Sequence, residues 1–176
     1  MNKIAFLTST LEYGGATKIM IELANYLSDY FEVSIINYGD NMVFYDIDNS
    51  IRVISAPHTA CTVPKIRLIK QMIQTRAFLK QYSFDAIIAF GNTEKLLAVY
   101  SMIGRKTKVI ISERQDPFNY VPGKKHTMWW RYELADGCVF QTVGAMKYFS
   151  HRVEKKSVVI PNFIEIADYQ FVPMNK

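Results

Sequence analysis

Short apolar runs alternate with helical patterns along this chain. Residues 4–7 form the first apolar run, and apolar or small residues then recur at spacings of three and four over 16–27, as on one face of a helix. Gly14 and Gly15 separate the run from the helical pattern. This order predicts a strand, a glycine loop and a helix, which together form the opening unit of an α/β domain.

The rest of the chain repeats this alternation. Runs rich in β-favouring or continuously apolar residues predict further strands over 31–38, 51–56, 85–91, 108–112, 137–142 and 157–160. Helical patterns between them predict helices over 62–82, 94–103, 124–135 and 143–150. About seven strands that alternate with helices predict a Rossmann-like, doubly wound α/β fold, with a mostly parallel sheet and helices on both faces.

Length and composition indicate the number of domains and the cellular environment of the protein. A chain of 176 residues with 49% hydrophobic and 21% charged residues fits one globular domain. We expect this domain to span residues 1–164, with a linker over 165–176, where no period is clear. The two cysteines show no metal-type spacing, and Cys138 lies in an apolar run, so a reduced, cytoplasmic setting is expected. No signal peptide and no membrane-spanning run are visible.

Charge is unevenly distributed. Residues 1–60 contain 3 Lys and Arg against 7 Asp and Glu, whereas residues 61–176 contain 18 against 9. The basic part suits anionic partners such as nucleotide phosphates or acidic lipid head groups, although a solvated basic surface is the simpler explanation. The segment 62–82 is basic, amphipathic and without acids. Nucleic acid is not expected, because no nucleic-acid-binding module is recognisable.

A second segment also suggests a surface. Cations and tryptophans stand together at Lys124, Lys125, Trp129 and Trp130. Basic residues beside aromatic rings suit an anionic membrane interface. The alternative is an ordinary helix with a wet basic face and tryptophans that pack on the sheet.

Candidate site residues follow from one rule. In doubly wound sheets, ligands bind outside the carboxyl ends of the strands. Gly14 and Gly15 therefore mark either a phosphate seat at a helix start or only a flexible turn. Asn92 and Thr93 are either a helix cap or ligand contacts, and Thr142 is a weaker candidate of the same kind.

The densest charged group at these strand ends is Glu113, Arg114 and Asp116. Two carboxylates beside a guanidinium suggest an ion-pair cluster that holds the loop. They also suit contacts to sugar hydroxyls, with Arg114 against a phosphate. Both interpretations stay open at this point.

Several kinds of chemistry are disfavoured. The three histidines form no metal pattern and no nucleophilic triad, and Asp46-Ile47-Asp48 lies in an expected loop, so no metal is predicted. The glycine patterns GxGxxG and GxxxxGK[ST] are absent, which disfavours dehydrogenases and nucleoside triphosphatases.

Five pieces carry a family resemblance: EYGGATKIMIELANYL, DAIIAFG, VIISERQDP, GCVFQT and VVIPNFIE. Their order resembles the N-terminal domain of the family 4 retaining glycosyltransferases, which have the GT-B fold, over roughly residues 3–166. Phe163 stands where that family often has glycine. The subgroup with a Ser-Glu-Arg-x-Asp-Pro loop is the most similar, and it builds surface polysaccharides and lipid-linked glycans.

The resemblance implies an enzyme that moves a sugar, with retention, from a nucleotide sugar to a glycan or lipid-linked acceptor. No cofactor is implied, since the nucleotide sugar is a co-substrate. The family's C-terminal nucleotide-sugar domain is not in this chain, so the chain alone is expected to be inactive. The protein is expected to be cytoplasmic, peripheral at the inner face of the membrane.

The resemblance also implies residue roles. Gly14 and Gly15 match the loop that approaches the donor diphosphate. Arg114 and Asp116 become candidate catalytic residues. Candidate contacts to acceptor or sugar are Glu113, Asn92, Thr93 and Thr142. The alternative is a non-catalytic binding or membrane-recruitment subunit that completes a site with a partner protein.

Overall fold

The structure is a computed structural model that describes residues 2–39, 43–57, 64–119 and 125–162. Its strands are β1 (Lys3–Thr8), β2 (Glu32–Asn37), β3 (Arg52–Ser55), β4 (Ala86–Ala89), β5 (Lys108–Ser112), β6 (Gly137–Phe140) and β7 (Ser157–Val159). Its helices are α1 (Gly15–Ser28), α2 (Pro64–Lys80), α3 (Asn92–Met102), α4 (Lys125–Leu134), α5 (Val143–Lys147) and α6 (His151–Glu154), with a 3₁₀ turn η1 (Pro117–Asn119). The expected linker over 165–176 lies outside the described residues.

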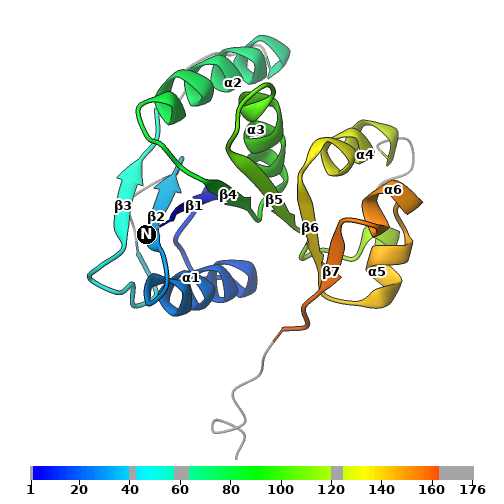
Figure 1. Ribbon diagram of the computed structural model, residues 1–176, viewed down its shortest axis with the longest axis horizontal. Coiled ribbons are helices and arrows are strands. Elements are labelled where there is room, and N and C mark those ends of the chain that lie inside the picture. Colours follow the sequence, from blue (N-terminus) through cyan, green and yellow to red (C-terminus); the bar gives the residue numbers. More distant parts are fainter. Residues whose placement is uncertain (1, 40–42, 58–63, 120–124, 163–176) are drawn as a thin grey trace, which may run out of the picture.

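The strands form one parallel sheet in the order β3-β2-β1-β4-β5-β6-β7. Each neighbouring pair is parallel, from β3 at one edge to β7 at the other. The strand order reverses beside β1, which lies between β2 and β4 (Figure 1). The predicted doubly wound α/β fold is therefore confirmed, and all carboxyl ends of the strands lie along one edge of the sheet.

The core has two halves, one on each face of the sheet. Ala5 and Leu7 of β1 pack into a cluster with residues of α2, α3, α4 and α6, whereas Ile4 and Phe6 pack into a second cluster with α1. This alternation is the period-two pattern of a strand that is buried on both faces. Figure 1 shows α1 and α2 on opposite sides of the sheet.

Helix α2 has the predicted position, and its apolar stripe does not face the core. Ile66, Ile69 and Ile73 share one face at helical spacing, and these side chains are 47%, 58% and 64% exposed. The helix docks instead through Leu79 and through polar residues, because Thr75 Oγ1 accepts a hydrogen bond from Tyr38 at 3.1 Å. Tertiary docking thus overrides the apolar pattern, and an isoleucine stripe faces solvent.

Two predicted helix boundaries change. Helix α3 begins at Asn92 with Gly91 as its N-cap and no side-chain cap, so the prediction that Asn92 and Thr93 cap this helix is wrong. A Cβ on Gly91 would lie 1.9 Å from the carboxylate of the buried Glu94, so a larger residue there would require the Glu94 side chain to move. The predicted helix over 143–150 ends earlier, at Lys147, as α5, and a separate short helix, α6, which was not predicted, follows with Ser150 as its N-cap.

Candidate functional site

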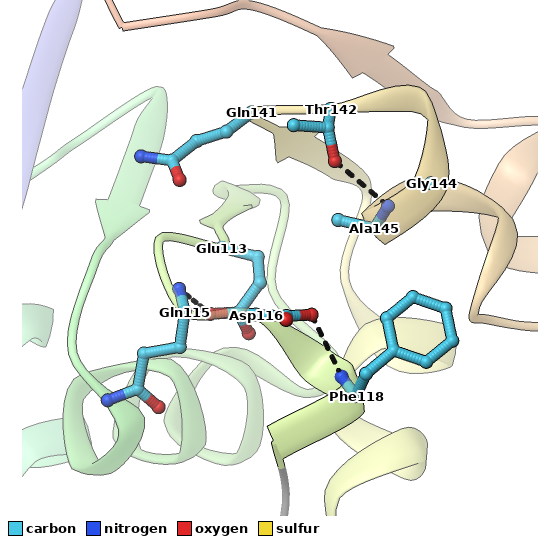
Figure 2. Close-up of a pocket in the computed structure, with 8 residues that line it drawn as sticks. All are labelled: Glu113, Gln115, Asp116, Phe118, Gln141, Thr142, Gly144 and Ala145. Carbon is cyan, nitrogen blue, oxygen red and sulfur yellow. Dashed lines mark hydrogen bonds between the residues drawn. The ribbon is translucent and has the colours of Figure 1, made fainter.

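Polar side chains from four neighbouring strands meet at the carboxyl edge of the sheet. They follow β4, β5, β6 and β7, and hydrogen bonds join each of these segments to another. A cavity of about 370 Å³ opens among them, lined by Glu113, Gln115, Asp116, Phe118, Gln141, Thr142, Gly144 and Ala145. Figure 2 shows the carboxylates of Glu113 and Asp116 between the Gln141–Thr142 segment and the side chains of Gln115 and Phe118.

Glu113 lies at the bottom of this site and is almost fully buried. Its Oε2 accepts hydrogen bonds from Lys95 Nζ at 2.9 Å and from the hydroxyl of Tyr132, and its Oε1 accepts the Gln115 amide at 2.8 Å. Burial lowers the pKa of Lys95, and the carboxylate of Glu113 opposes that change. Lys95 and Glu113 are in contact inside the protein, and this contact fixes the start of the loop after β5.

These contacts correct one prediction and narrow another. The expected ion-pair cluster of Glu113, Arg114 and Asp116 is wrong, because Glu113 pairs with Lys95 of α3. A contact between Glu113 and a sugar stays a prediction. The hydrogen bonds that the structure describes for Glu113 give it a structural role, which is to hold the loop after β5 in place. The sequence contains a signal for Lys95 that was missed: it stands at helical spacings of three and four from the buried Ala98 and Val99.

Arg114 lies on the outer side of the same loop. Its Nε donates to Ser112 Oγ at 2.9 Å, its Nη1 donates to Asn162 Oδ1 at 2.7 Å, and its guanidinium stacks over the Phe90 ring at 5.1 Å. Burial lowers the pKa of Arg114 from its usual value, and nearby Glu113 opposes this. Arginine keeps its proton even so. The site therefore contains a fixed positive charge.

Asp116 faces the cavity and also shapes the loop. Its Oδ1 accepts the Phe118 amide at 3.0 Å, and its Oδ2 accepts Asn119 Nδ2 at 3.2 Å. These bonds cap η1 much as an aspartate caps a helix. The Asp116 side chain is exposed, so it could reach a ligand, and this role stays a prediction. The capping bonds already give Asp116 a structural role that needs no ligand.

Three further candidates follow neighbouring strands. Asn92 Nδ2 donates to Gln115 Oε1 at 3.1 Å, which ties the start of α3 to the β5 loop. Thr142 Oγ1 accepts the Ala145 amide at 3.0 Å and is the N-cap of α5 (Figure 2). Thr93 is exposed at the second position of α3. The structure thus places Asn92 and Thr142 beside the cavity, and each also has a local structural partner.

Gly14 and Gly15 lie at the same edge, after β1. Gly14 is the N-cap of α1 in an extended conformation, and its N–H donates to the Tyr45 hydroxyl at 3.1 Å. A Cβ on Gly15 would meet nothing within 4 Å, and one on Gly14 would make only an ordinary contact at 3.6 Å. Neither packing nor backbone conformation therefore requires these two glycines.

The predicted membrane segment is only partly described. Lys124 and the side chain of Lys125 lie outside the described part of the chain. Trp129 is half-buried and packs against Tyr148 at 6.4 Å between ring centroids, whereas Trp130 is 62% exposed. The two tryptophans thus differ in exposure, because successive positions of α4 point in different directions, and the contact of this segment with a membrane stays a prediction.

Two features are absent from the described residues. Within them, no group of three or more His, Cys, Asp or Glu side chains is placed to hold a metal ion. None of the helices in this part of the chain combines the length and the apolar character needed to span a membrane.

Comparisons with known proteins agree with this geometry. No family model matches the sequence. The chain is 33% identical over 119 residues to a Campylobacter jejuni protein named as a GalNAc-α-(1→4)-GalNAc-α-(1→3)-diNAcBac-PP-undecaprenol α-1,4-N-acetyl-D-galactosaminyltransferase. That match covers 66% of this chain and 33% of the relative.

Solved structures extend the match to most of the chain. The lipopolysaccharide outer core galactosyltransferase WaaB aligns with a TM-score of 0.70 and 16% identity, over 93% of this chain and 46% of WaaB. Anabaena HepE, solved with UDP and glucose, aligns with a TM-score of 0.66 and 13% identity, over 95% of this chain and 46% of HepE. This chain therefore spans a third of the curated relative and less than half of these structures. Sequence similarity and fold together identify the chain as a GT-B glycosyltransferase domain.

Proposed function

We propose that this chain is the acceptor-side domain of a retaining glycosyltransferase, which transfers a sugar from a nucleotide sugar to a glycan or lipid-linked acceptor. The observation that carries the proposal is the cavity at the carboxyl edge of the sheet. An exposed carboxylate, Asp116, and the side-chain amides of Gln115 and Gln141 line it, and the fixed guanidinium of Arg114 lies on the same loop. These groups suit a hydroxyl-rich or phosphorylated ligand.

The relatives support the chemical classes of donor and acceptor. HepE is described in complex with UDP-glucose, which supports a nucleotide sugar as donor. The Campylobacter jejuni relative is named for an acceptor linked to undecaprenyl diphosphate, which supports a lipid-linked glycan as acceptor. Both relatives are compared over part of their length, so donor and acceptor remain proposals for this protein. An enzyme is favoured over the non-catalytic subunit.

The proposed site is one wall of a cleft. Its described polar groups lie along a single sheet edge, and the solved relatives are about twice as long as this chain. We therefore propose that a C-terminal domain supplies the nucleotide pocket and that these 176 residues alone turn over no nucleotide sugar. Catalysis would rest on positioning and on stabilising the departing diphosphate.

The test is a donor screen with the natural protein. Purified protein is incubated with UDP-, GDP- and dTDP-sugars and a lipid-diphosphate glycan acceptor, and the product's anomeric configuration is read by NMR. Transfer with retention supports the proposal. Transfer with inversion would contradict the proposal that the enzyme retains the anomeric configuration. Turnover by residues 1–176 alone would contradict the proposal that a second domain is needed.

The diphosphate seat at Gly14 and Gly15 is tested separately. Because a Cβ at Gly15 meets nothing within 4 Å, Gly15→Ala should leave the folded structure intact. A bound diphosphate that approaches this backbone would collide with the new methyl group, so the donor KM should rise by about tenfold or more. An unchanged donor KM would remove the seat.

We also propose that the protein docks on an anionic membrane surface through the outer face of α2. Ile66, Ile69 and Ile73 form an exposed stripe on this helix. The exposed Arg67 and Lys70 flank the stripe, and α2 contains no acidic residue. Apolar side chains between cations are what an interfacial helix presents to acidic lipid, at about 1 kcal/mol for each cation near the surface.

Vesicle co-sedimentation tests this surface. The variant Ile69→Ser/Ile73→Ser should lose binding to vesicles that contain phosphatidylglycerol, while its thermal unfolding stays close to wild type because both side chains are exposed. Ile103→Ser, at a 52% exposed isoleucine after α3, is the matched control. Equal binding by wild type and the double variant would place membrane contact elsewhere, and Trp130→Ala would then test α4.

A further inference from the structure

One side-chain oxygen joins the ends of three neighbouring strands. Asn162 Oδ1 accepts a hydrogen bond from Arg114 Nη1 at 2.7 Å and another from Gln141 Nε2 at 2.9 Å. These residues follow β5, β6 and β7, and 48 positions separate Arg114 from Asn162. Asn162 thus spans the sheet edge beside the cavity at the point where the chain leaves the sheet.

The bond to Asn162 completes the fixation of Arg114. Nε is bound to Ser112 Oγ at 2.9 Å, Nη1 is bound to Asn162, and the guanidinium stacks over Phe90. Hydrogen bonds at both Nε and Nη1 prevent rotation of the planar group. Within the described part of the chain, Nη2 makes no hydrogen bond.

The acceptors of Arg114 are chemically informative because both are uncharged. A hydroxyl and an amide hold the guanidinium in place without cancelling its charge, whereas a carboxylate would do both. The adjacent carboxylate, Glu113, is already bound to Lys95. The arrangement therefore preserves a cation whose geometry is fixed.

We propose that Asn162 is a positioning residue: it holds Arg114 so that the guanidinium meets an anionic group of the bound substrate. This inference rests on the proposed function, since the anion there would be the donor diphosphate or an acceptor phosphate. Because Asn162 follows β7, which ends at Val159, the course of the chain after β7 sets the orientation of Arg114. An asparagine suits this role because its amide oxygen accepts two donors and remains neutral.

Steady-state kinetics of the natural protein test the role. Asn162→Ala should lower kcat by about tenfold or more, with a smaller change in KM, because the guanidinium is present but wrongly oriented. Asn162→Asp keeps an acceptor oxygen at the same place, so kcat should largely recover, while the added negative charge raises KM for the anionic substrate. Asn49→Ala, at an exposed asparagine between β2 and β3, is the matched control and should change neither.

A double variant shows whether Asn162 acts through Arg114. If it does, Arg114→Ala/Asn162→Ala should be no slower than Arg114→Ala alone. Additive losses would overturn the positioning role, because a merely structural contribution of Asn162 would add to that of Arg114. An unchanged kcat in Asn162→Ala would overturn it as well.

A second readout separates this inference from the proposed function. In the natural protein with isotope-labelled arginine, NMR measures rotation about the Nε–Cζ bond of Arg114, which should be faster in Asn162→Ala and close to wild type in Asn162→Asp. Unchanged rotation in Asn162→Ala overturns the positioning role. Faster rotation, together with no transfer from any nucleotide sugar, supports the positioning role and removes the proposed function.

Discussion

Strand β5 has a lysine–carboxylate ion pair at each end, and the two pairs differ mainly in their surroundings. At the amino end, Lys108 Nζ lies 2.8 Å from Asp136 Oδ1, and the two side chains are 67% and 40% exposed. Beyond the carboxyl end, Lys95 Nζ lies 2.9 Å from Glu113 Oε2, and the side chains are 2% and 1% exposed. The two ion pairs therefore have nearly equal distances, but one lies in water and the other lies inside the protein.

Because of this difference in burial, the two ion pairs are expected to contribute very differently to the stability of the fold. An exposed pair contributes about 0–1 kcal/mol to stability, whereas loss of one partner from a buried pair costs about 3–5 kcal/mol. The buried pair also removes Glu113 as a partner for its neighbour. Arg114 lies on the other side of the loop, where the acceptors that the structure describes for it, Ser112 and Asn162, are uncharged.

The largest expected effect is that of Lys95→Met. The substitution keeps most of the side-chain volume but leaves the Glu113 carboxylate buried beside Tyr132 without its cation, at a cost of about 3–5 kcal/mol in the free energy of unfolding. Urea unfolding followed by circular dichroism measures this cost.

The control for Lys95→Met is the double variant Lys95→Met/Glu113→Leu. It removes both charges and should recover a large part of the stability, since apolar replacements of a buried pair are often neutral. A cost below about 1 kcal/mol for Lys95→Met would show that water reaches the pair, and the contrast between the two ends of β5 would disappear.

Local patterns were sufficient to predict the strands of this fold. The apolar residues 109–111, within the segment 108–112, predict β5 with the bounds that the structure has, because a strand buried on both faces has an almost uniformly apolar centre. The same run and the carboxyl-end rule also predict that 113–116 form part of a site. These predictions need only information from neighbouring residues.

Local patterns could not predict which residues from distant elements contact the site. Lys95 and Tyr132 come from α3 and α4 and lie 18 and 19 positions from Glu113, so the pattern around Glu113 says nothing about them. The orientation of α2 depends on distant partners in the same way: the helix docks through Thr75 and Leu79, and the isoleucine stripe remains outside. Position follows from local sequence, whereas pairing and orientation follow from docking.

Thr142→Ala should have an intermediate effect. The residue lies at the carboxyl edge, where its hydroxyl accepts the Ala145 amide as the N-cap of α5. Loss of such a cap costs about 1 kcal/mol in the free energy of unfolding. Thr142→Ser keeps the hydroxyl and should restore stability, as thermal unfolding can show. If Thr142→Ala lowers transfer by the natural protein while Thr142→Ser restores stability but not transfer, the residue also contacts a ligand.

The smallest expected effect is at the exposed end of β5. Burial raises the pKa of Asp136, but hydrogen bonds from Lys108 and from the Val109 amide outweigh it, so the pKa lies below its usual value. A carboxylate with a depressed pKa stabilises the fold above its unfolded pKa of about 3.9, and this stability is lost as the pH falls through the folded pKa.

Because the pair is largely exposed, Lys108→Met should cost less than about 1 kcal/mol at neutral pH, and less again in molar salt. Urea unfolding over a series of pH values from 7 downward measures both effects, and the difference between variant and wild type should shrink as the pH falls through the folded pKa of Asp136. A cost for Lys108→Met as large as that for Lys95→Met would show that burial is not what distinguishes the two ends of the strand.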